Sequence, residues 1–408
     1  MISVEEAQKI ILAEIRRIGT ERVPLGPSLG RTLAEEIASP LDHPPWDTSA
    51  MDGYAVRGSD TAGASPGAPR TLKIIEEIPA GTMPQKTVQP GEASKIMTGA
   101  PLPEGADAVV KVEETERSGD QVRIFEAAEE GDFIRKKGEA VRTGDLILKK
   151  GIRIRPADIA MMASIGRSVV PVYQQPRVAI LSTGDELADL DEPRGPNKIL
   201  NSNGYGLAAQ VIEAGGVPIV LGIAKDTPGD LRAKLKQGLH ADFILASGGV
   251  SMGDYDFVRD VLAELGAEMK FWKVAMKPGQ PLAFGVIAGK PAFGLPGNPV
   301  SAMVSFEQFV RPALLKTAGR DDLLRPILHA TLEEEVRKHP GKRHFMRAIV
   351  SVQNGEYRVR TTGDQDSHIL LSLVKANALM ILSEEGDRVQ AGEKVAVQLL
   401  SDLLVAGN

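Results

Sequence analysis

The sequence predicts a multidomain α/β protein, and three observations lead to this fold class. Its 408 residues exceed the roughly 100 to 200 residues of a typical domain, which predicts two to four domains. Between residues 177 and 325, apolar runs alternate with helical segments, a pattern typical of a parallel sheet covered by helices on both faces. Elsewhere, strand-like runs are separated by turns rich in the chain's 42 glycines and 27 prolines, which favours β-rich flanking domains.

The composition limits the classes of function. The 48 Lys and Arg residues against 54 Asp and Glu give a net charge of −6, which argues against broad attraction to nucleic acid or anionic membranes. The absence of cysteine excludes disulfides, thiolate catalysis and cysteine zinc sites. No apolar run approaches the roughly 18 residues of a membrane span, and charges are frequent in the first 19 residues. We expect a soluble cytoplasmic protein without nucleic-acid or membrane partners.

The amino-terminal half predicts a helical linker domain interrupted by a β-rich domain. Ser3 and Glu6 form a capping box before apolar residues at helical spacing, which end at Gly19. A second helical pattern covers 152–171, with Pro156 near its first position. The turn-rich stretches 40–53 and 58–69 predict loops, and four runs predict strands, namely Leu72–Ile78, Ala93–Met97, Ala108–Glu113 and Gln121–Phe125. We assign 1–45 and 140–176 to the linker domain and 46–139 to the β-rich domain.

The carboxy-terminal half predicts two further domains. Apolar runs starting at Arg177, Val217 and Asp242 predict parallel strands with a helix after each, and 281–286 and 291–295 continue the sheet. A long helix from about Pro299 to Lys316 closes this three-layer α/β/α domain, which we place at 177–325. The segments after Pro326 look like strands separated by turns, so we expect a carboxy-terminal β domain at 326–408.

Polar residues follow three of the predicted parallel strands, where ligands of open α/β sheets collect. Thr183 to Glu186 follow the first strand, Lys225 and Asp226 the second, and Ser247 to Ser251 the third. Glycine lets backbone amides approach a phosphate, and serine adds hydroxyl donors, so 247–253 predicts a phosphate cradle. An ordinary tight turn is the alternative for this segment taken alone.

Carboxylates at these strand ends suit a hard cation. Asp185, Glu186, Asp226, Asp254 and Asp256 are oxygen ligands of the kind that Mg²⁺ uses when it bridges phosphates. Helix capping explains Asp254 and Asp256 equally well.

Two lysines give the sharpest signal. Lys273 and Lys277 lie four apart in a segment of β character, which on one strand places them on one face about 13 Å apart. They are then spaced to grip two anionic parts of one ligand, although lysines that protect an edge strand are the alternative. The turn Pro296, Gly297 and Asn298 precedes a helix and offers free amides to a phosphate, or is only a well-capped helix start.

Further polar residues are weaker candidates. Asp52 and Thr98 lie in loops of the amino-terminal half, where turn formation explains them. Arg347 and Ser367, with Arg343 and His368, are suited to closing over a tetrahedral oxyanion, or they belong to a solvated β surface. The chain shows no HExxH, GxSxG or Walker A motif, which removes support for zinc proteolysis, serine hydrolysis and common nucleotide folds.

Taken together, these fragments resemble a known family. The resemblance spans nearly the whole chain and is to the molybdopterin molybdenumtransferases, the MoeA type related to the carboxy-terminal domain of gephyrin. Six segments carry it in order: DTSAMDGYAVR (47–57), IMTGAPLPEGADAVVKVEE (96–114), LSTGDEL (181–187), ASGGVSMGDYD (246–256), WKVAMKPGQPLAFG (272–285) and GLPGNPVSAMVSFE (294–307).

The resemblance implies a homodimer of four-domain subunits, with the active site between the α/β domain of one chain and the β-rich domain of the other. It implies a reaction in which molybdate is inserted into adenylylated molybdopterin with Mg²⁺, releasing AMP and molybdenum cofactor. The implied transient partners are a molybdopterin adenylyltransferase and molybdenum enzymes or their chaperones.

The resemblance also assigns roles by motif. Catalytic roles fall on Asp52, Thr98, Glu186, Asp226, Asp256, Lys273 and Lys277, the first two facing the partner's α/β domain. Metal binding falls on Asp185, Glu186 and Asp256. Substrate binding falls on Asp185, Ser247, Gly248, Gly249, Ser251, Pro296, Gly297, Asn298, Arg347 and Ser367, with Lys273, Lys277, Arg347 and Ser367 holding molybdate.

Two positions depart from the family pattern in ways that bear on rate or affinity more than on identity. Ala140 stands where an aspartate is common, and Gln280 stands where lysine is frequent, which removes a positive charge. One rival function is a molybdopterin adenylyltransferase, which uses the same type of α/β domain and would transfer adenylyl groups from ATP. The other is a binding scaffold with a degenerate cleft, which molybdate-dependent AMP release would exclude.

Overall fold

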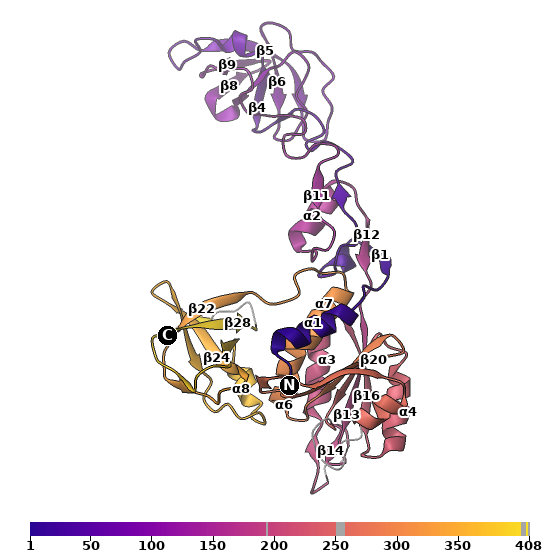
Figure 1. Ribbon diagram of the computed structural model, residues 1–408. Helices are drawn as coiled ribbons and strands as arrows, with labels where there is room; N and C mark the ends of the chain where they lie inside the picture. Colours follow the sequence, from indigo (N-terminus) through magenta and orange to yellow (C-terminus); the bar gives the residue numbers. More distant parts are fainter. Residues whose placement is uncertain (193–194, 250–257, 401–404, 407–408) are drawn as a thin grey trace. The chain divides into compact units, whose positions relative to one another are not determined.

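The computed structural model describes residues 1–192, 195–249, 258–400 and 405–406 (Figure 1). The chain divides into two compact units. One consists of residues 1–34, 151–156 and 169–408, and the other of residues 35–150 and 157–168.

The smaller unit is built on a mixed six-stranded sheet. Its strand order is β7-β4-β6-β5-β9-β8, and β5 and β6 run parallel. The strands are β4 (Gly53–Val56), β5 (Arg70–Ile78), β6 (Glu92–Ile96), β7 (Ala108–Lys111), β8 (Thr115–Ser118) and β9 (Gln121–Ile124). Short elements complete the unit: β2 (Ile37–Ala38), β3 (Thr48–Ser49), β10 (Ile134–Arg135), β11 (Leu146–Leu148), the 3₁₀ turns at Gly58–Thr61 and Val112–Glu114, and helix α2 (Pro156–Ser164).

The four strands predicted between 72 and 125 are confirmed, but β8 and the more deeply buried β4 were missed. Strand β4 was harder to recognise. It follows a turn-rich loop, has only four residues, and is fully buried between β6 and β7. Gly53 allows this packing, because a Cβ on it would lie 2.0 Å from the Val110 carbonyl oxygen. Tyr54 and Val56 from β4 pack into the apolar core of the sheet.

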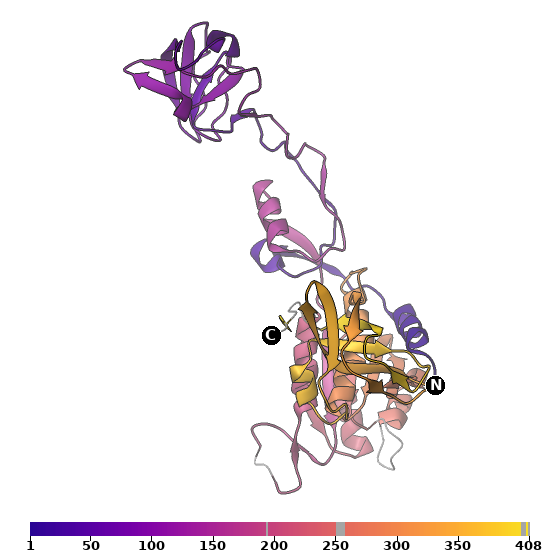
Figure 2. The ribbon, with the colours of Figure 1, turned by 90° about the vertical axis from the view of Figure 1, so that its left-hand side faces the viewer.

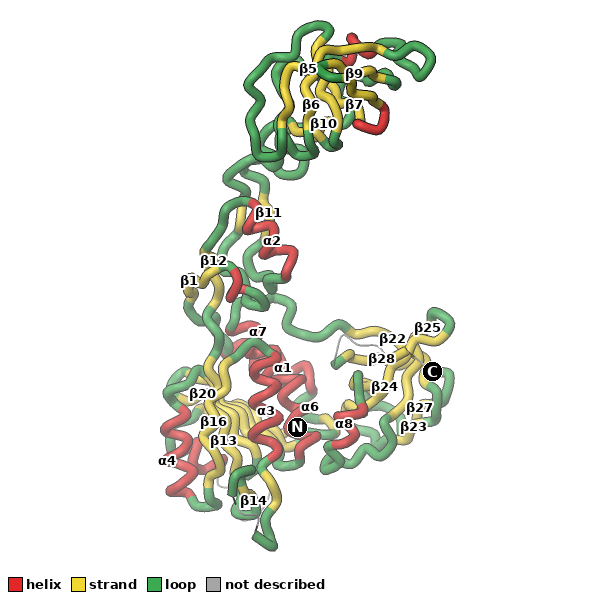
Figure 3. The backbone as a smooth tube through the Cα atoms, turned by 180° about the vertical axis from the view of Figure 1, so that it is seen from behind, coloured by secondary structure: helices red, strands yellow, loops and turns green. Residues whose placement is uncertain are grey.

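The larger unit contains a six-stranded sheet of order β16-β13-β17-β21-β20-β18 (Figure 3). Its strands are β13 (Arg177–Thr183), β16 (Val217–Ala224), β17 (Phe243–Ser247), β18 (Glu268–Lys273), β20 (Pro281–Ile287) and β21 (Lys290–Leu295). Its helices are α1 (Val4–Glu14), α3 (Ser202–Glu213), α4 (Pro228–Gly238), α5 (Val258–Glu264), α6 (Pro299–Ser305) and α7 (Arg311–Thr317). Smaller elements are β1 (Thr20–Pro24), the 3₁₀ turn Gly26–Ser28, β12 (Val169–Tyr173), β14 (Leu187–Ala188) and β15 (Ile199–Leu200).

Helices pack on both faces of this sheet. Leu207 and Val211 of α3 join Val178, Ile180 and residues of α1, α6 and α7 in one core. Leu231 and Leu235 of α4 and Val261 of α5 pack on the other face. The first helix begins as predicted, since the Ser3 hydroxyl accepts from the Glu6 amide, but it ends at Glu14 rather than near Gly19. The predicted helix 299–316 is one run with a π-helical turn at Phe306–Val310.

The prediction of a parallel sheet was wrong for one strand, β20. Strands β16, β13, β17 and β21 are parallel, but β20 is antiparallel to both β21 and β18. Only Ala288 and Gly289, both at positive φ, separate β20 from β21. A two-residue turn of this kind joins antiparallel strands, because a parallel neighbour requires a crossover of a dozen or more residues.

The carboxy-terminal segment forms a closed, barrel-like sheet (Figure 2). Strand β24 (Arg343–Gln353) pairs with both β25 and β26, which closes the ring β24-β25-β22-β28-β26. The other members are β22 (Ile327–Leu332), β25 (Glu356–Thr361), β26 (Ala378–Leu382) and β28 (Lys394–Leu399). Attached to it are β19 (Met276–Lys277) and β29 (Val405–Ala406), the pair β23 (Val336–Arg337) and β27 (Arg388–Val389), and helix α8 (Leu371–Lys375). The predicted carboxy-terminal β domain is confirmed.

Candidate functional site

The carboxyl ends of three parallel strands lie side by side. Ser182 of β13 is in register with Ser247 of β17, and Ser247 is in register with Leu295 of β21. The segments that leave these strands line a cavity of about 900 Å³. Residues after β19 and residues of the barrel, including Ser367, form the rest of its wall. This cavity lies where the sequence placed the ligand site, at the carboxyl ends of the parallel strands.

The loop after β17 approaches the end of β13 closely. Gly248 and Gly249 have φ values of +94° and +65°, and the Gly248 amide donates to the Leu295 carbonyl oxygen at 3.0 Å. A Cβ on Gly248 would lie 2.6 Å from the Thr183 carbonyl oxygen. The Thr183 hydroxyl is buried, lines the cavity and has no hydrogen-bond partner within the described residues. A buried hydroxyl without a partner is costly, which singles out Thr183 among the polar residues of this wall.

Side-chain amides connect this loop to the neighbouring segments. Asn203 donates to the Ser247 hydroxyl at 2.9 Å and to the Gly297 carbonyl oxygen at 2.7 Å. Asn298 occupies the predicted N-cap position of α6, yet its side chain makes no capping bond and instead donates to the Ser367 hydroxyl at 2.9 Å. Asn298 therefore joins the sheet domain to the barrel across the cavity wall.

The acidic candidates separate into two groups. Asp185 and Asp226 are reciprocal partners, since each carboxylate accepts from the other's backbone amide at 3.1 to 3.2 Å. Glu186 and Asp226 line the cavity, whereas Asp185 does not. Across the residues whose positions are given, no three Asp, Glu or His side chains form a preassembled metal site. Asp254, Asp256 and Ser251 lie outside the described residues.

The prediction that Lys273 and Lys277 share one strand face was wrong. Strand β18 ends at Lys273, and Lys277 belongs to β19, which pairs with β24 of the barrel instead. Lys277 lines the large cavity, and Lys273 lines neither that cavity nor the adjoining one described next. A different lysine, Lys342 from the segment before β24, also lines the large cavity.

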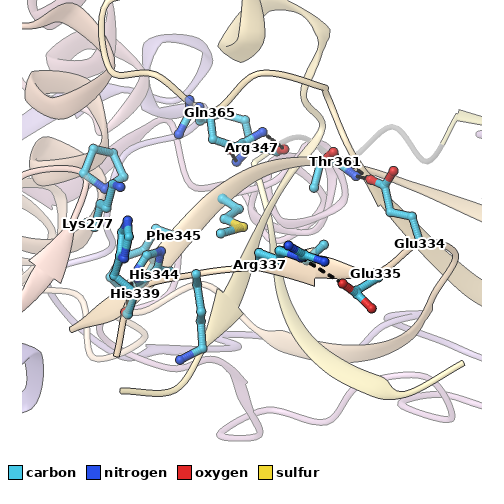
Figure 4. A pocket seen from close by; sticks show the side chains of 14 residues that line it. Lys277, Glu334, Glu335, Arg337, His339, His344, Phe345, Arg347, Thr361 and Gln365 are labelled. Atoms are coloured by element: carbon cyan, nitrogen blue, oxygen red, sulfur yellow. Dashed lines mark hydrogen bonds and ion pairs between the residues drawn. The ribbon is translucent and has the colours of Figure 1, made fainter. Parts of the chain in front are cut away.

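A second cavity of about 360 Å³ adjoins the first and shares Lys277, Pro278 and Gln365 with it (Figure 4). Its wall is rich in basic side chains, namely Lys277, Arg337, Lys338, His339, His344 and Arg347. The Arg337 guanidinium pairs with Glu335 at 3.0 Å, and the Glu334 carboxylate accepts from the Thr361 amide and hydroxyl. The cations outnumber the carboxylates, which suits an oxyanion.

Arg347 is the most deeply buried of these cations, at 1% exposure. Its Nε donates to the Ser372 hydroxyl at 3.0 Å and its Nη2 to the Asp366 carbonyl oxygen at 3.2 Å. Burial lowers the pKa of Arg347 to about 10, only partly offset by Asp364 and Asp366. A guanidinium carries five N–H groups, so donors remain for a bound anion, whose charge would also compensate the burial.

His344 is buried beside these cations. Burial, and in addition the positive charges of Lys277 and Lys338, lower its pKa to about 4, against the raising effect of the hydrogen bond to the His339 backbone. Its Nε2 lies 3.0 Å from the His339 carbonyl oxygen, which can only accept, so Nε2 carries the proton of the neutral ring. Because the His344 ring is neutral, it adds no positive charge to this cavity.

Asp52 and Thr98 meet in the smaller unit. One Asp52 carboxylate oxygen accepts from the Thr98 hydroxyl at 2.6 Å and from its amide at 2.7 Å. These two hydrogen bonds lower the pKa of Asp52. Both residues are exposed, so the smaller unit presents an ionised carboxylate on its surface.

Comparison with known proteins identifies the family. Three family models match in order: the MoeA N-terminal region (domain I and II) over residues 2–166, a probable molybdopterin-binding domain over 179–316, and the MoeA C-terminal region (domain IV) over 329–400. A curated relative from Mycobacterium tuberculosis, molybdopterin molybdenumtransferase 2, is 41% identical over 97% of this chain and 99% of its own. The chain belongs to the molybdopterin molybdenumtransferase family.

Other members agree with this assignment. The molybdopterin molybdenumtransferase of Nostoc sp. is 38% identical over 97% of this chain and 93% of its own length. The solved structure of a molybdopterin biosynthesis MoeA protein from Pyrococcus horikoshii shares 34% identity and superposes with a TM-score of 0.84, covering 99% of this chain and all of that chain. Within the described residues, no helix is long and apolar enough to cross a membrane.

Several residues that line the two cavities were not predicted as site residues. Only Thr183 among them had a signal in the sequence. Thr183 follows the strand VAILS directly and was visible as a strand-end hydroxyl. Asn203, Lys342, Gln365 and His344 lack such a signal, because each enters the wall through a contact between segments distant in sequence.

Proposed function

We propose that this chain inserts molybdate into adenylylated molybdopterin and releases AMP and molybdenum cofactor in a Mg²⁺-dependent reaction. One observation carries the proposal beyond family membership: a large cavity at glycine-rich strand ends adjoins a smaller basic cavity, and Lys277 lines both. The two volumes differ as the two substrates do, since an adenylylated pterin is far larger than a tetrahedral oxyanion.

The larger cavity is assigned to the adenylylated pterin. We place its phosphates at the loop Ser247 to Gly249 and at the turn Pro296 to Asn298, which line the cavity together with Thr183. Molybdate occupies the smaller cavity, held by Lys277 and Arg347, with Ser367 at the boundary to the pterin. The roles of Lys273, Asp256 and Ser251 remain predictions from the resemblance.

The residues present fit Mg²⁺ as an ion that bridges substrate phosphates. Glu186 and Asp226 offer carboxylates in the cavity wall, and Asp185 orients the Asp226 loop through its reciprocal hydrogen bonds. Mg²⁺ commonly binds through one or two carboxylates plus substrate phosphates, so a preassembled cage of three side chains is not needed. Held by these carboxylates, the ion would supply positive charge to the phosphoanhydride.

The protein contributes orientation and charge, without a covalent enzyme intermediate. A water oxygen attacks the phosphorus on the pterin side of the anhydride, and the bond from that phosphorus to the bridging oxygen breaks. AMP leaves with the bridging oxygen, the pterin keeps its phosphate, and the proton released from water passes to solvent. Lys277 stabilises the negative charge that develops between the two cavities, because it lines both. The site thereby places the anhydride that is cleaved next to the molybdate that is inserted.

We also propose a cytoplasmic homodimer in which Asp52 and Thr98 complete the partner's site. Exposed apolar side chains support such an interface, since Tyr205 and Ile212 of α3 and Val220 of β16 are 48%, 63% and 53% exposed. The first two lie seven residues apart on one face of α3, which packs beside β16. A molybdopterin adenylyltransferase and molybdenum enzymes or their chaperones are the proposed transient partners. We further propose that the packing on both sheet faces is a three-layer α/β/α arrangement.

AMP release tests the reaction. Purified protein should release AMP from adenylylated molybdopterin only when molybdate and Mg²⁺ are present, and Lys277→Ala should lower this rate at least about 100-fold with an unchanged circular dichroism spectrum. Lys236→Ala, on the exposed side of α4, is the matched control and should retain the wild-type rate. Adenylyl transfer from ATP to molybdopterin without AMP release would instead favour the adenylyltransferase.

Mixing inactive subunits tests the shared site. Asp52→Ala and Lys277→Ala proteins are each expected to be inactive. After mixing and subunit exchange, about half the dimers are hybrids with one of two sites intact, so about a quarter of wild-type activity should return. Mixtures that stay inactive, with exchange verified by mass-tagged subunits, would contradict an intersubunit site.

A further inference from the structure

Lys342 occupies a position in the large cavity that no feature of the sequence marked. It precedes β24, and hydrogen bonds fix the backbone on both sides: the Gly341 amide donates to the Glu384 carbonyl oxygen at 2.8 Å and the Arg343 amide to the Ala275 carbonyl oxygen at 2.9 Å. From there its side chain reaches Gln280 of the sheet domain and lines the cavity. The barrel thus contributes a cation to a cavity that begins at the sheet.

The partner of this ammonium leaves its charge uncompensated. Lys342 Nζ donates to Gln280 Oε1, a neutral amide oxygen. Among the residues with given positions, no carboxylate lies within ion-pair distance of Lys342. A half-buried lysine bonded to a neutral acceptor keeps donors for an anion.

The charges around the cavity show why a second cation matters. Described acidic residues in the wall are Glu186, Asp226 and Asp366, whereas the lysines are Lys277 and Lys342. Lys277 also faces the smaller cavity, but Lys342 lines only the larger one. Lys342 is therefore the lysine that serves only a polyanion in the larger cavity, whereas Lys277 also faces the oxyanion in the smaller one.

We propose that Lys342 binds the phosphoanhydride of the adenylylated substrate, while Gln280 holds its side chain in place. This inference rests on the proposed function and adds a substrate-binding residue to it. A purely structural role, in which the Lys342–Gln280 hydrogen bond only ties the barrel to the sheet domain, is the competing explanation. Substitutions at the two positions separate these roles.

Lys342→Gln removes the charge while leaving an amide that can still bond Gln280. It should raise KM for adenylylated molybdopterin about 10-fold or more, because a hydrogen bond from a charged group is lost, and change KM for molybdate less than about 2-fold. Lys342→Arg should recover most of the affinity. Gln280→Ala keeps the charge and breaks the tie, so it should change either KM far less than Lys342→Gln does.

A swap of the two residues provides the decisive comparison. Gln280→Lys combined with Lys342→Gln returns an ammonium to within hydrogen-bond distance of its original place, and KM for the adenylylated substrate should return to within about 3-fold of wild type. An unchanged KM in Lys342→Gln, a rise in KM for molybdate instead, or equal damage from Gln280→Ala would overturn the assignment.

Calorimetric titration with AMP measures the phosphate contact without turnover. Lys342→Gln should weaken AMP binding, and the swap should restore it; equal affinities for wild type and Lys342→Gln would count against the contact. Wild-type protein that fails to release AMP would refute the proposed function, whereas active wild type with normal Lys342→Gln would refute only the role of Lys342.

Discussion

The substitution Gly248→Ala tests whether the loop after β17 holds substrate phosphates. A Cβ there would lie 2.6 Å from the Thr183 carbonyl oxygen and 2.8 Å from its hydroxyl oxygen. The carbonyl belongs to the backbone and cannot rotate away, so the loop must retreat by about 0.8 Å to reach ordinary van der Waals contact of roughly 3.4 Å. The φ of +94° adds about 1 kcal/mol for a residue with a side chain.

The expected result is a large kinetic effect with a small loss of stability. A displacement near 1 Å at a reacting group costs up to about 100-fold in rate, so kcat/KM for AMP release should fall by between about 10-fold and 100-fold. Urea unfolding followed by circular dichroism should show a loss of about 1 to 3 kcal/mol. The control is Gly229→Ala on α4, where a Cβ meets nothing within 4 Å. Wild-type kcat/KM in Gly248→Ala would refute the role of this loop.

Three further outcomes follow from the structure. Glu307 is 6% exposed and accepts from Arg325 Nε at 2.7 Å and Gln398 Nε2 at 3.1 Å. Glu307→Ala leaves the half-buried Arg325 with only the exposed Glu213, at 3.2 Å, and should cost about 1 to 3 kcal/mol in urea unfolding. Glu335→Ala, which removes the partner of the exposed Arg337, should stay within about 0.5 kcal/mol. The pKa of His344 is about 4 when folded and 6.5 in the unfolded reference, so only the unfolded chain takes up this proton between those pH values, and stability falls as pH drops through that window. His344→Gln should flatten that fall by about 3 kcal/mol, and identical pH profiles would contradict the buried neutral ring. Val220→Lys should shift sedimentation toward monomer if the exposed apolar face of β16 is the dimer interface, and an unaltered sedimentation coefficient would exclude it.

Much of the fold could be predicted because burial leaves a local pattern. The runs VAILS, VPIVLGIA and DFILA are strands of one sheet, and their carboxyl ends form the cavity. The direction of β20 could also have been predicted. Its predicted end at Val286 and the next predicted start at Pro291 leave too few residues for a parallel crossover, so the short connection already indicated a hairpin.

The placement of individual cations could not be predicted from local patterns. Lys273 and Lys277 look like one strand, because nothing in WKVAMK shows that Met276 and Lys277 pair with Arg343 and His344, some 67 residues later. The bond between Lys342 and Gln280 depends on the same long-range pairing. Spacing along the chain fixes which residues share a face only while one strand continues.

The pairing of strand β19 limits where the barrel can be exchanged between homologous proteins. Its residues are encoded within the sheet domain, yet their pairing partner is β24 of the barrel. A chimera that exchanges the barrel between homologues, with a junction near residue 326, would splice a foreign strand against the native Met276–Lys277 pair. Successful junctions are therefore expected outside the interval from β19 to β24.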